Sequence, residues 1–190
     1  YSGSSLAGDA GHVIIEGCNF EITPDKSWPA SLFYDCDYVD IKESNIRVLN
    51  SGGSSSNSTD LFYGISQQMT ITDSEITTTL RRSTASETYR FAMSSGRNAP
   101  TLMLDGDTVF NSQERLYCKN LILEDSSILN VGANLDGYLF ASNLQVRDNA
   151  SINADTILVS GYSTSSKSNE DEVIANLSAK SPSIRDGSSG

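Results

Sequence analysis

Residues 39–48 read VDIKESNIRV, and this phrase indicates the fold because the chain contains six versions of it. Each version begins with apolar residues at alternate positions, breaks at a short polar turn, and then becomes apolar again. We number the versions as repeats 1 to 6 in chain order: residues 13–22 (VIIEGCNFEI), 39–48, 69–78 (MTITDSEITT), 102–111 (LMLDGDTVFN), 121–130 (LILEDSSILN) and 144–154 (LQVRDNASINA). Alternation is the period of a β-strand, so each repeat predicts two strands joined by a turn.

A second phrase precedes most repeats and adds a third strand. It reads SLFYDC from residue 31, DLFYGI from 60, RFAMSS from 90, RLYCKN from 115, YLFASN from 138 and TILVSG from 156. Successive repeats start 26, 30, 33, 19 and 23 residues apart. A unit of this size with three strands corresponds to one turn of a parallel β-solenoid, in which stacking buries the apolar faces that a single turn would leave exposed.

Stacking the repeats gives columns that test this interpretation. Three columns are apolar throughout and are predicted to face inward: Val13, Val39, Met69, Leu102, Leu121 and Leu144; Ile15, Ile41, Ile71, Leu104, Leu123 and Val146; and Phe20, Ile46, Ile76, Val109, Ile128 and Ile152. The residues between the first two columns form a mixed set that suits an outer face: Ile14, Asp40, Thr70, Met103, Ile122 and Gln145.

The composition excludes several classes of protein. A chain of 190 residues fits one domain, and 37% hydrophobic residues are enough for a core. The net charge of -11 argues against nucleic acid as a partner, because phosphate binding needs clustered cations. No apolar run approaches the length of about 18 residues that a membrane-spanning helix needs. The three cysteines, Cys18, Cys36 and Cys118, predict small buried side chains, with a Cys18–Cys36 disulfide as the alternative.

The two ends of the chain differ in character from the repeats. The chain starts at Tyr1 without a leader, so we expect a processed form or a fragment. We divide the chain into a β-helix at residues 1–161 and a C-terminal cap with a polar tail at residues 162–190. Residues 168–181 (SNEDEVIANLSAKS) predict a short capping helix with Ser168 or Asn169 as the N-cap. Such a cap would cover the exposed sheet edge at the end of a solenoid.

The three-strand repeats, the loops of unequal length and the polar turn within each repeat resemble the right-handed parallel β-helix of the pectin-lyase-like superfamily. The resemblance covers about residues 6–161 and lies in the repeat pattern, not in a diagnostic motif. It implies an all-β, three-sided, right-handed parallel β-helix of about six coils, and right-handed crossovers are the rule for parallel strands. Members include pectate lyases, polygalacturonases, phage tailspikes, autotransporter passengers and non-catalytic carbohydrate-binding or adhesin modules on bacterial surfaces.

A column of aromatic residues in the first strand of each coil is the main candidate binding site. Strand periodicity puts this column outside: Phe33, Phe62, Phe91, Tyr117 and Phe140. Polar neighbours that would add contacts are Tyr89, Tyr138, Arg115 and Lys119. Such a stripe could stack on a polysaccharide, or form a protein–protein or self-association face. The alternative is an aromatic stack buried inside the coils.

The turns between the second and third strands place acidic residues in register. The best pairs are Glu43 with Asp73 and Asp107 with Asp125, whose carboxylates would repel each other unless a cation such as Ca²⁺ lay between them. Tight turns also prefer Asp, Asn and Gly for backbone reasons alone, which is the explanation we favour. No cofactor other than this candidate Ca²⁺ is expected.

The function expected from the sequence is a non-catalytic extracellular adhesin or carbohydrate-binding module, which recognises a polysaccharide or cell-surface partner along the flank of the β-helix. One alternative is a pectinase-type polysaccharide lyase or glycoside hydrolase. It has little support, because the outward positions of the first strands hold no acidic pair on adjacent coils, and the single histidine, His12, suits a structural role. The other alternative is a structural stalk of a larger surface protein.

Overall fold

The computed structural model describes residues 5–22, 31–49, 65–79, 90–92, 101–112, 115–132, 138–164, 177–178 and 181–184. These residues form β-strands and the turns between them, with no helix among them. This part of the chain therefore contains no helix that could cross a membrane. The expectation of an all-β chain is confirmed for the described residues.

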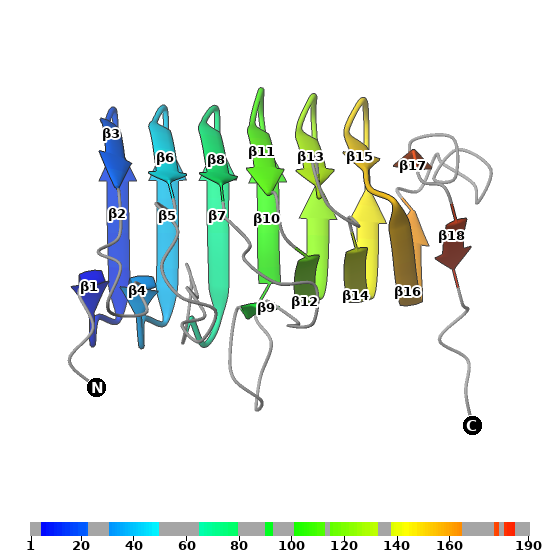
Figure 1. The fold of residues 1–190 in the computed structure, drawn as a ribbon, viewed down its shortest axis with the longest axis horizontal. Coiled ribbons are helices and arrows are strands. Elements are labelled where there is room, and N and C mark those ends of the chain that lie inside the picture. Colours follow the sequence, from blue (N-terminus) through cyan, green and yellow to red (C-terminus); the bar gives the residue numbers. More distant parts are fainter. Residues whose placement is uncertain are drawn as a thin grey trace.

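The larger of two long sheets extends along the molecule from β2 to β18 (Figure 1). Its strands pair in the spatial order β2 (His12–Glu16), β5 (Tyr38–Lys42), β7 (Gln68–Thr72), β10 (Thr101–Asp105), β12 (Arg115–Leu123), β14 (Tyr138–Val146), β16 (Thr156–Thr164) and β18 (Ser181–Ile184), and β9 (Arg90–Ala92) pairs with β12. Every one of these pairs is parallel.

The smaller long sheet follows the same chain order. Its strands are β3 (Asn19–Ile22), β6 (Asn45–Leu49), β8 (Glu75–Thr79), β11 (Val109–Ser112), β13 (Ile128–Val131), β15 (Ser151–Asn153) and β17 (Leu177–Ser178), and a separate parallel pair joins β1 (Ser5–Gly8) to β4 (Ser31–Tyr34). Each repeat passes once through each long sheet, and its strands pair with those of the neighbouring repeats (Figure 1). This is the stacked, parallel arrangement of a β-solenoid.

The first two inward columns lie in register as predicted. Val39 pairs with Val13 and Met69, and Ile41 pairs with Ile15 and Ile71. From repeat 2 to repeat 6 every member of both columns is buried, with at most 1% of its surface exposed. The apolar core therefore runs along the stack, between the two long sheets.

The third inward column is shifted by one residue in repeats 4 and 5. The register places Phe110 and Leu129 opposite the buried isoleucines of repeats 3 and 6, and both residues are themselves fully buried. Val109 and Ile128 are partly exposed. The prediction that Val109 and Ile128 face inward is therefore wrong.

The shift has its origin in the length of the turn between the two strands of a repeat. The inward residues that flank the turn are five positions apart in repeat 3 (Ile71 and Ile76) but six apart in repeat 4 (Leu104 and Phe110). Repeats 5 and 6 have the longer spacing as well. Because the side-chain period of a strand is two, one extra residue reverses which side chains face the core.

A buried row of hydroxyl groups accompanies these turns. The backbone N–H of Cys18 donates to Ser44 Oγ at 3.1 Å, that of Ser44 to Ser74 Oγ at 3.0 Å, and that of Ser74 to Thr108 Oγ1 at 3.4 Å. Each hydroxyl in turn donates to a carbonyl oxygen of its own repeat. The row satisfies buried amides at the corner of the stack, where the sheet hydrogen bonds are interrupted.

The C-terminal region is not the predicted helix where the structure describes it. Leu177–Ser178 form β17, and Ser181–Ile184 form β18, which pairs with β16. The remainder of the predicted helix at residues 168–181 lies outside the described residues. Strand pairing thus continues beyond residue 161, where the β-helix was expected to end.

The cysteines behave mainly as predicted. No disulfide joins the three, all of which the structure describes. Cys36 and Cys118 are buried, whereas Cys18 is partly exposed. Burial raises the pKa of the Cys118 thiol to about 12, so this thiol stays protonated at neutral pH.

Candidate functional site

The outer surface of the larger sheet is a regular polar surface built by strand alternation. In β2, β5, β7, β10, β12 and β14, every second side chain points away from the core, and we call these side chains the outer face. They form three columns: His12, Tyr38, Gln68, Thr101, Asn120 and Asn143; Ile14, Asp40, Thr70, Met103, Ile122 and Gln145; and Glu16, Lys42, Thr72, Asp105, Glu124 and Arg147. The second column is the set predicted to lie outside, and that prediction is confirmed.

An aromatic and aliphatic cluster lies at the β2 end of the outer face. Ile14 is 60% exposed and Tyr38 is 47% exposed, which makes them the exposed large hydrophobic side chains of the described chain. The His12 ring meets the Tyr38 ring edge-on, with centroids 6.0 Å apart, and His12 Nε2 lies 2.9 Å from Asp40 Oδ2. The carboxylate and the ring contact hold His12 in place, so the cluster combines two rings, an aliphatic side chain and a carboxylate on one surface.

A row of side-chain amides lies on the outer face along strands β10, β12 and β14. Asn143 Nδ2 donates to Asn120 Oδ1 at 2.8 Å, and Asn120 Nδ2 donates to Thr101 Oγ1 at 3.0 Å. Each amide keeps further donor or acceptor capacity beyond the bond to its neighbour. The outer face therefore presents hydrogen-bonding groups at the strand spacing of about 4.8 Å.

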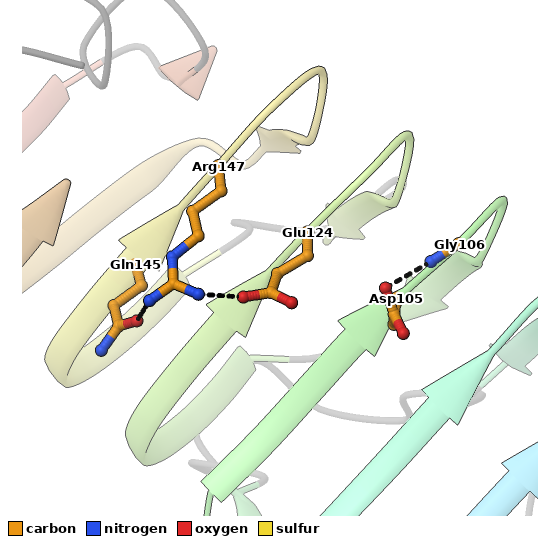
Figure 2. Close-up of polar contacts among 5 residues, drawn as sticks. All are labelled: Asp105, Gly106, Glu124, Gln145 and Arg147. Atoms are coloured by element: carbon orange, nitrogen blue, oxygen red, sulfur yellow. Dashed lines mark hydrogen bonds and ion pairs between the residues drawn. The ribbon is translucent and has the colours of Figure 1, made fainter. Parts of the chain in front are cut away.

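A charged group lies on the outer face just beyond the ends of β12 and β14 (Figure 2). Arg147 contacts the carboxylate of Glu124, which follows the neighbouring strand β12, and its second terminal nitrogen donates to Gln145 Oε1 at 2.6 Å. The bond to Glu124 crosses between repeats 5 and 6. The two partners of Arg147 therefore hold its guanidinium group against the sheet.

The residues proposed for Ca²⁺ lie at the turns between the two long sheets. Gly17, Glu43, Asp73, Gly106, Asp125 and Asp148 occupy equivalent positions, and all six have the left-handed backbone conformation. Glycine and, less readily, Asp adopt that conformation, so the backbone alone accounts for the residue type at every one of these positions except Glu43. Within the described residues no group of three or more His, Cys, Asp or Glu side chains is placed to hold a metal ion.

The predicted acidic pairs differ from the contacts that the structure shows. Asp73 Oδ1 accepts a hydrogen bond from the backbone N–H of Asp107 at 3.0 Å. The partner of Asp125 is Asp105, and their side-chain hydrogen bond raises the pKa of Asp125, with smaller contributions from desolvation and from the charges of Asp105 and Asp148. Asp105 was missing from the predicted metal set, because it belongs to the strand and not to the turn.

The predicted aromatic column is not continuous. Phe33 is fully buried, so the expectation that it faces outward is wrong. The register pairs Phe91 with the buried Leu116, and Ala92 with Tyr117, so Phe91 does not belong to the column of Tyr117. The predicted alignment of this segment is wrong by one residue, since Arg90 pairs with Arg115.

The remaining residues of the predicted column are described only in part. Tyr117 pairs in register with Phe140, and Lys119 is exposed. Tyr138 and Arg115 lie in strands, but their side chains, like those of Tyr117 and Phe140, are outside the described set. Phe62 and Tyr89 lie outside the described residues altogether.

Sequence reasoning did not recognise the cluster around Tyr38. The signal was present, since Tyr38 immediately precedes Val39, an inward residue, and alternation then puts Tyr38 outside. His12 was interpreted by itself, without the strand that brings Asp40 beside it.

Comparison of the chain with protein-family models, with curated proteins and with solved structures finds no match.

Proposed function

We propose that the protein is a non-catalytic, extracellular carbohydrate-binding or adhesin module that holds an extended polysaccharide along the outer face. The observation that carries the proposal is the cluster of Tyr38, His12 and Asp40 on the same surface as the row of side-chain amides. A sugar ring has an apolar face that packs on an aromatic ring and hydroxyl groups that pair with carboxylates and amides. We further propose a right-handed solenoid of about six coils, as the resemblance to the pectin-lyase-like superfamily implies.

The charge of the chain narrows the ligand class. A net charge of -11 repels acidic polymers at low ionic strength, whereas it has no such effect on neutral polymers. The outer face itself carries both signs, with Lys42 and Arg147 among carboxylates. We therefore expect a neutral polysaccharide to bind more tightly than polygalacturonate in the absence of calcium.

Binding of the full chain to a panel of neutral polysaccharides and polygalacturonate, with and without Ca²⁺, tests the proposal. Tyr38→Ala is expected to weaken binding of the preferred polysaccharide about tenfold, which corresponds to about 1.4 kcal/mol. Tyr38→Phe keeps the ring and should retain most of the affinity. Glu75→Ala changes an exposed side chain on the smaller sheet and serves as the matched control.

The same panel separates the two other functions. Release of reducing or unsaturated ends, lost on Asp125→Asn, would favour a hydrolase or lyase that uses the Asp105–Asp125 pair. A chain that binds no polysaccharide and releases no product would favour a structural stalk. Affinity that is unchanged in Tyr38→Ala would contradict the placement of the ligand on the outer face.

A further inference from the structure

The peptide bond between Asp105 and Gly106 lies at the end of β10, where repeat 4 enters its turn. The backbone N–H of Gly106 donates to Asp105 Oδ1 at 2.9 Å (Figure 2). The carboxyl group of Asp105 therefore lies against the nitrogen atom of the next peptide unit. A carboxyl group held in this position is placed to form a five-membered imide with that nitrogen, because proximity supplies much of what ring closure needs.

The surroundings of this peptide unit favour attack by its nitrogen atom. Gly106 has no side chain that would shield the nitrogen. The carbonyl oxygen of Asp105 belongs to the same peptide unit, and it accepts hydrogen bonds from Thr108 Oγ1 at 2.6 Å and from the backbone N–H of Asp73 at 3.3 Å. Negative charge moves onto this oxygen as the nitrogen loses its proton, so the two donors stabilise the charge where it develops.

A second carboxyl group lies beside that of Asp105. Asp125, one repeat further on, forms a side-chain hydrogen bond with Asp105 that raises the pKa of Asp125, and a hydrogen bond from the Gly106 N–H opposes this shift in part. Two carboxyl groups share a hydrogen bond only while one of them holds a proton, so Asp125 is the nearby proton donor for Asp105. The other charged groups along this corner are Asp73, Asp107 and Asp148, together with Glu124, which is paired with Arg147.

We propose that the Asp105–Gly106 peptide is a site of spontaneous covalent modification, at which Asp105 cyclises to a succinimide that hydrolyses to isoaspartate. The Gly106 nitrogen bonds to Asp105 Cγ while the bond from Cγ to one carboxylate oxygen breaks. That oxygen leaves as water with one proton from the Gly106 nitrogen and one from Asp125, which is left ionised. Water then opens the ring at either carbonyl carbon and gives Asp or isoaspartate. The proposal does not depend on the proposed function.

Isoaspartate would change the turn that sets the register of repeat 4. The main chain would then pass through Cβ and Cγ of residue 105, which adds one atom to the chain between Asp105 and Gly106. Both residues are partly exposed, so water has access to the ring. Because turn length decides which side chains of a repeat face the core, the modification is expected to loosen the pairing of β10 and β11 with their neighbours.

Ageing of the full chain measures the reaction. The chain is kept at neutral pH, both folded and in denaturant, and is then digested. Mass spectrometry detects the succinimide in the peptide that contains residue 105 by the loss of one water, and isoaspartate by a changed retention at unchanged mass. We expect isoaspartate at residue 105 to form at least about threefold faster in the folded chain than in the unfolded chain, because the turn holds the reacting groups together. The two other Asp–Gly pairs, at residues 136–137 and 186–187, calibrate the rate in denaturant.

Variants identify the reacting groups. Asp105→Glu should abolish the modification, since its longer side chain would have to close a six-membered ring. Asp125→Gly keeps the turn, because Gly17 and Gly106 occupy equivalent positions, but removes the proton donor. It should slow the reaction in the folded chain at least about tenfold and leave the rate in denaturant unchanged. Asp35→Gly makes the same substitution at an exposed left-handed Asp outside the pair, and this matched control should react like the native chain.

Two results would overturn the proposal. A folded chain that reacts no faster than the unfolded chain would show that the fold protects Asp105 instead of activating it. Equal rates in the folded native chain and folded Asp125→Gly, or a slowing of Asp125→Gly that persists in denaturant, would rule out proton transfer from Asp125 within the turn.

Discussion

Single side chains in this protein take their properties from the repeats above and below them. Asp125 is exposed, yet the pKa of its carboxyl group is raised by the hydrogen bond to Asp105 of the preceding repeat. Stacking at the spacing of β-strands brings like side chains together whenever the sequence phrase is copied. The carboxyl groups of Asp105, Asp125 and Asp148 therefore repel one another when they are ionised.

Replacement of Asp125 by Asn should stabilise the fold at neutral pH. The pKa of Asp125 is higher in the folded chain than in the unfolded chain, where the pKa of an Asp carboxyl group is about 3.9. The folded state thus binds the proton more tightly, so ionisation of Asp125 costs stability as the pH rises through this range. We expect Asp125→Asn to have a higher midpoint of thermal unfolding than the native chain at pH 7, and the advantage to shrink as the pH falls toward that of an unperturbed Asp.

Thermal unfolding of both chains across the acidic range measures this difference. Asp35→Asn is the control, because Asp35 is an exposed Asp with the same left-handed backbone conformation outside the Asp105–Asp125 pair. A gain in Asp125→Asn that is equally large at every pH would show that the carboxyl interaction is not its cause.

The turn is the element that sets the register of each repeat. Every described turn between the two long sheets that belongs to repeats 1 to 6 uses one residue with positive φ, and two of these residues are Gly17 and Gly106. Their backbone angles are nearly the same, at 62° and 64°. Their surroundings differ, since a Cβ atom on Gly17 would meet nothing within 4 Å, whereas one on Gly106 would lie 2.1 Å from Asp73 Oδ1.

Substitution of these two glycines distinguishes the effect of backbone strain on stability from the effect of steric crowding. Gly17→Ala is expected to cost about 1–2 kcal/mol of unfolding free energy, the penalty of the left-handed conformation for a residue with a Cβ atom. Gly106→Ala should cost more, because the Asp73 carboxylate must move and give up its hydrogen bond to the Asp107 N–H. Denaturant unfolding measures both values. In an Asp73→Ala background the two substitutions should cost the same, and a persistent difference would refute the role of Asp73.

On the scale of the whole molecule, stability should vary along the stack. Interior strands such as β7 and β10 have a parallel neighbour on each side, whereas β2 has one in the described chain. In a repeat array each unit is stabilised by its neighbours, so local opening is easiest at the ends.

Hydrogen exchange of the backbone amides provides the corresponding measurement. In the 190-residue chain, the Ile14 amide should exchange much faster than the Ile71 amide. The N–H of Ile14 points away from β5, the one strand that pairs with β2 among the described residues, whereas β7 is paired on both sides. Equal protection of the two amides would contradict this prediction.

Much of this architecture could be read from the repeated phrase. The inward columns that contain Val39 and Ile41 were predictable. In most repeats the two apolar residues are separated by one residue of mixed character, so strand alternation allows only one of the two faces to be buried. The mixed outer column around Asp40 followed from the same alternation. The turn residues were predictable as turn formers, although their pairing was not, because Asp105 reaches Asp125 from the neighbouring strand.

Other features required the three-dimensional arrangement. Val109 and Phe110 are both apolar, so the pattern could not say which one faces the core, and the longer turn decided it. The same one-residue uncertainty placed Phe91 in the wrong column of the prediction. Phe33 was assigned to the surface, although it is buried. The pairing of His12 with Asp40 depends on which strands become neighbours. Local alternation is a property of consecutive residues and is written in the chain, whereas register between repeats depends on turn length and on packing between segments some 20–30 residues apart, which only the folded stack brings together.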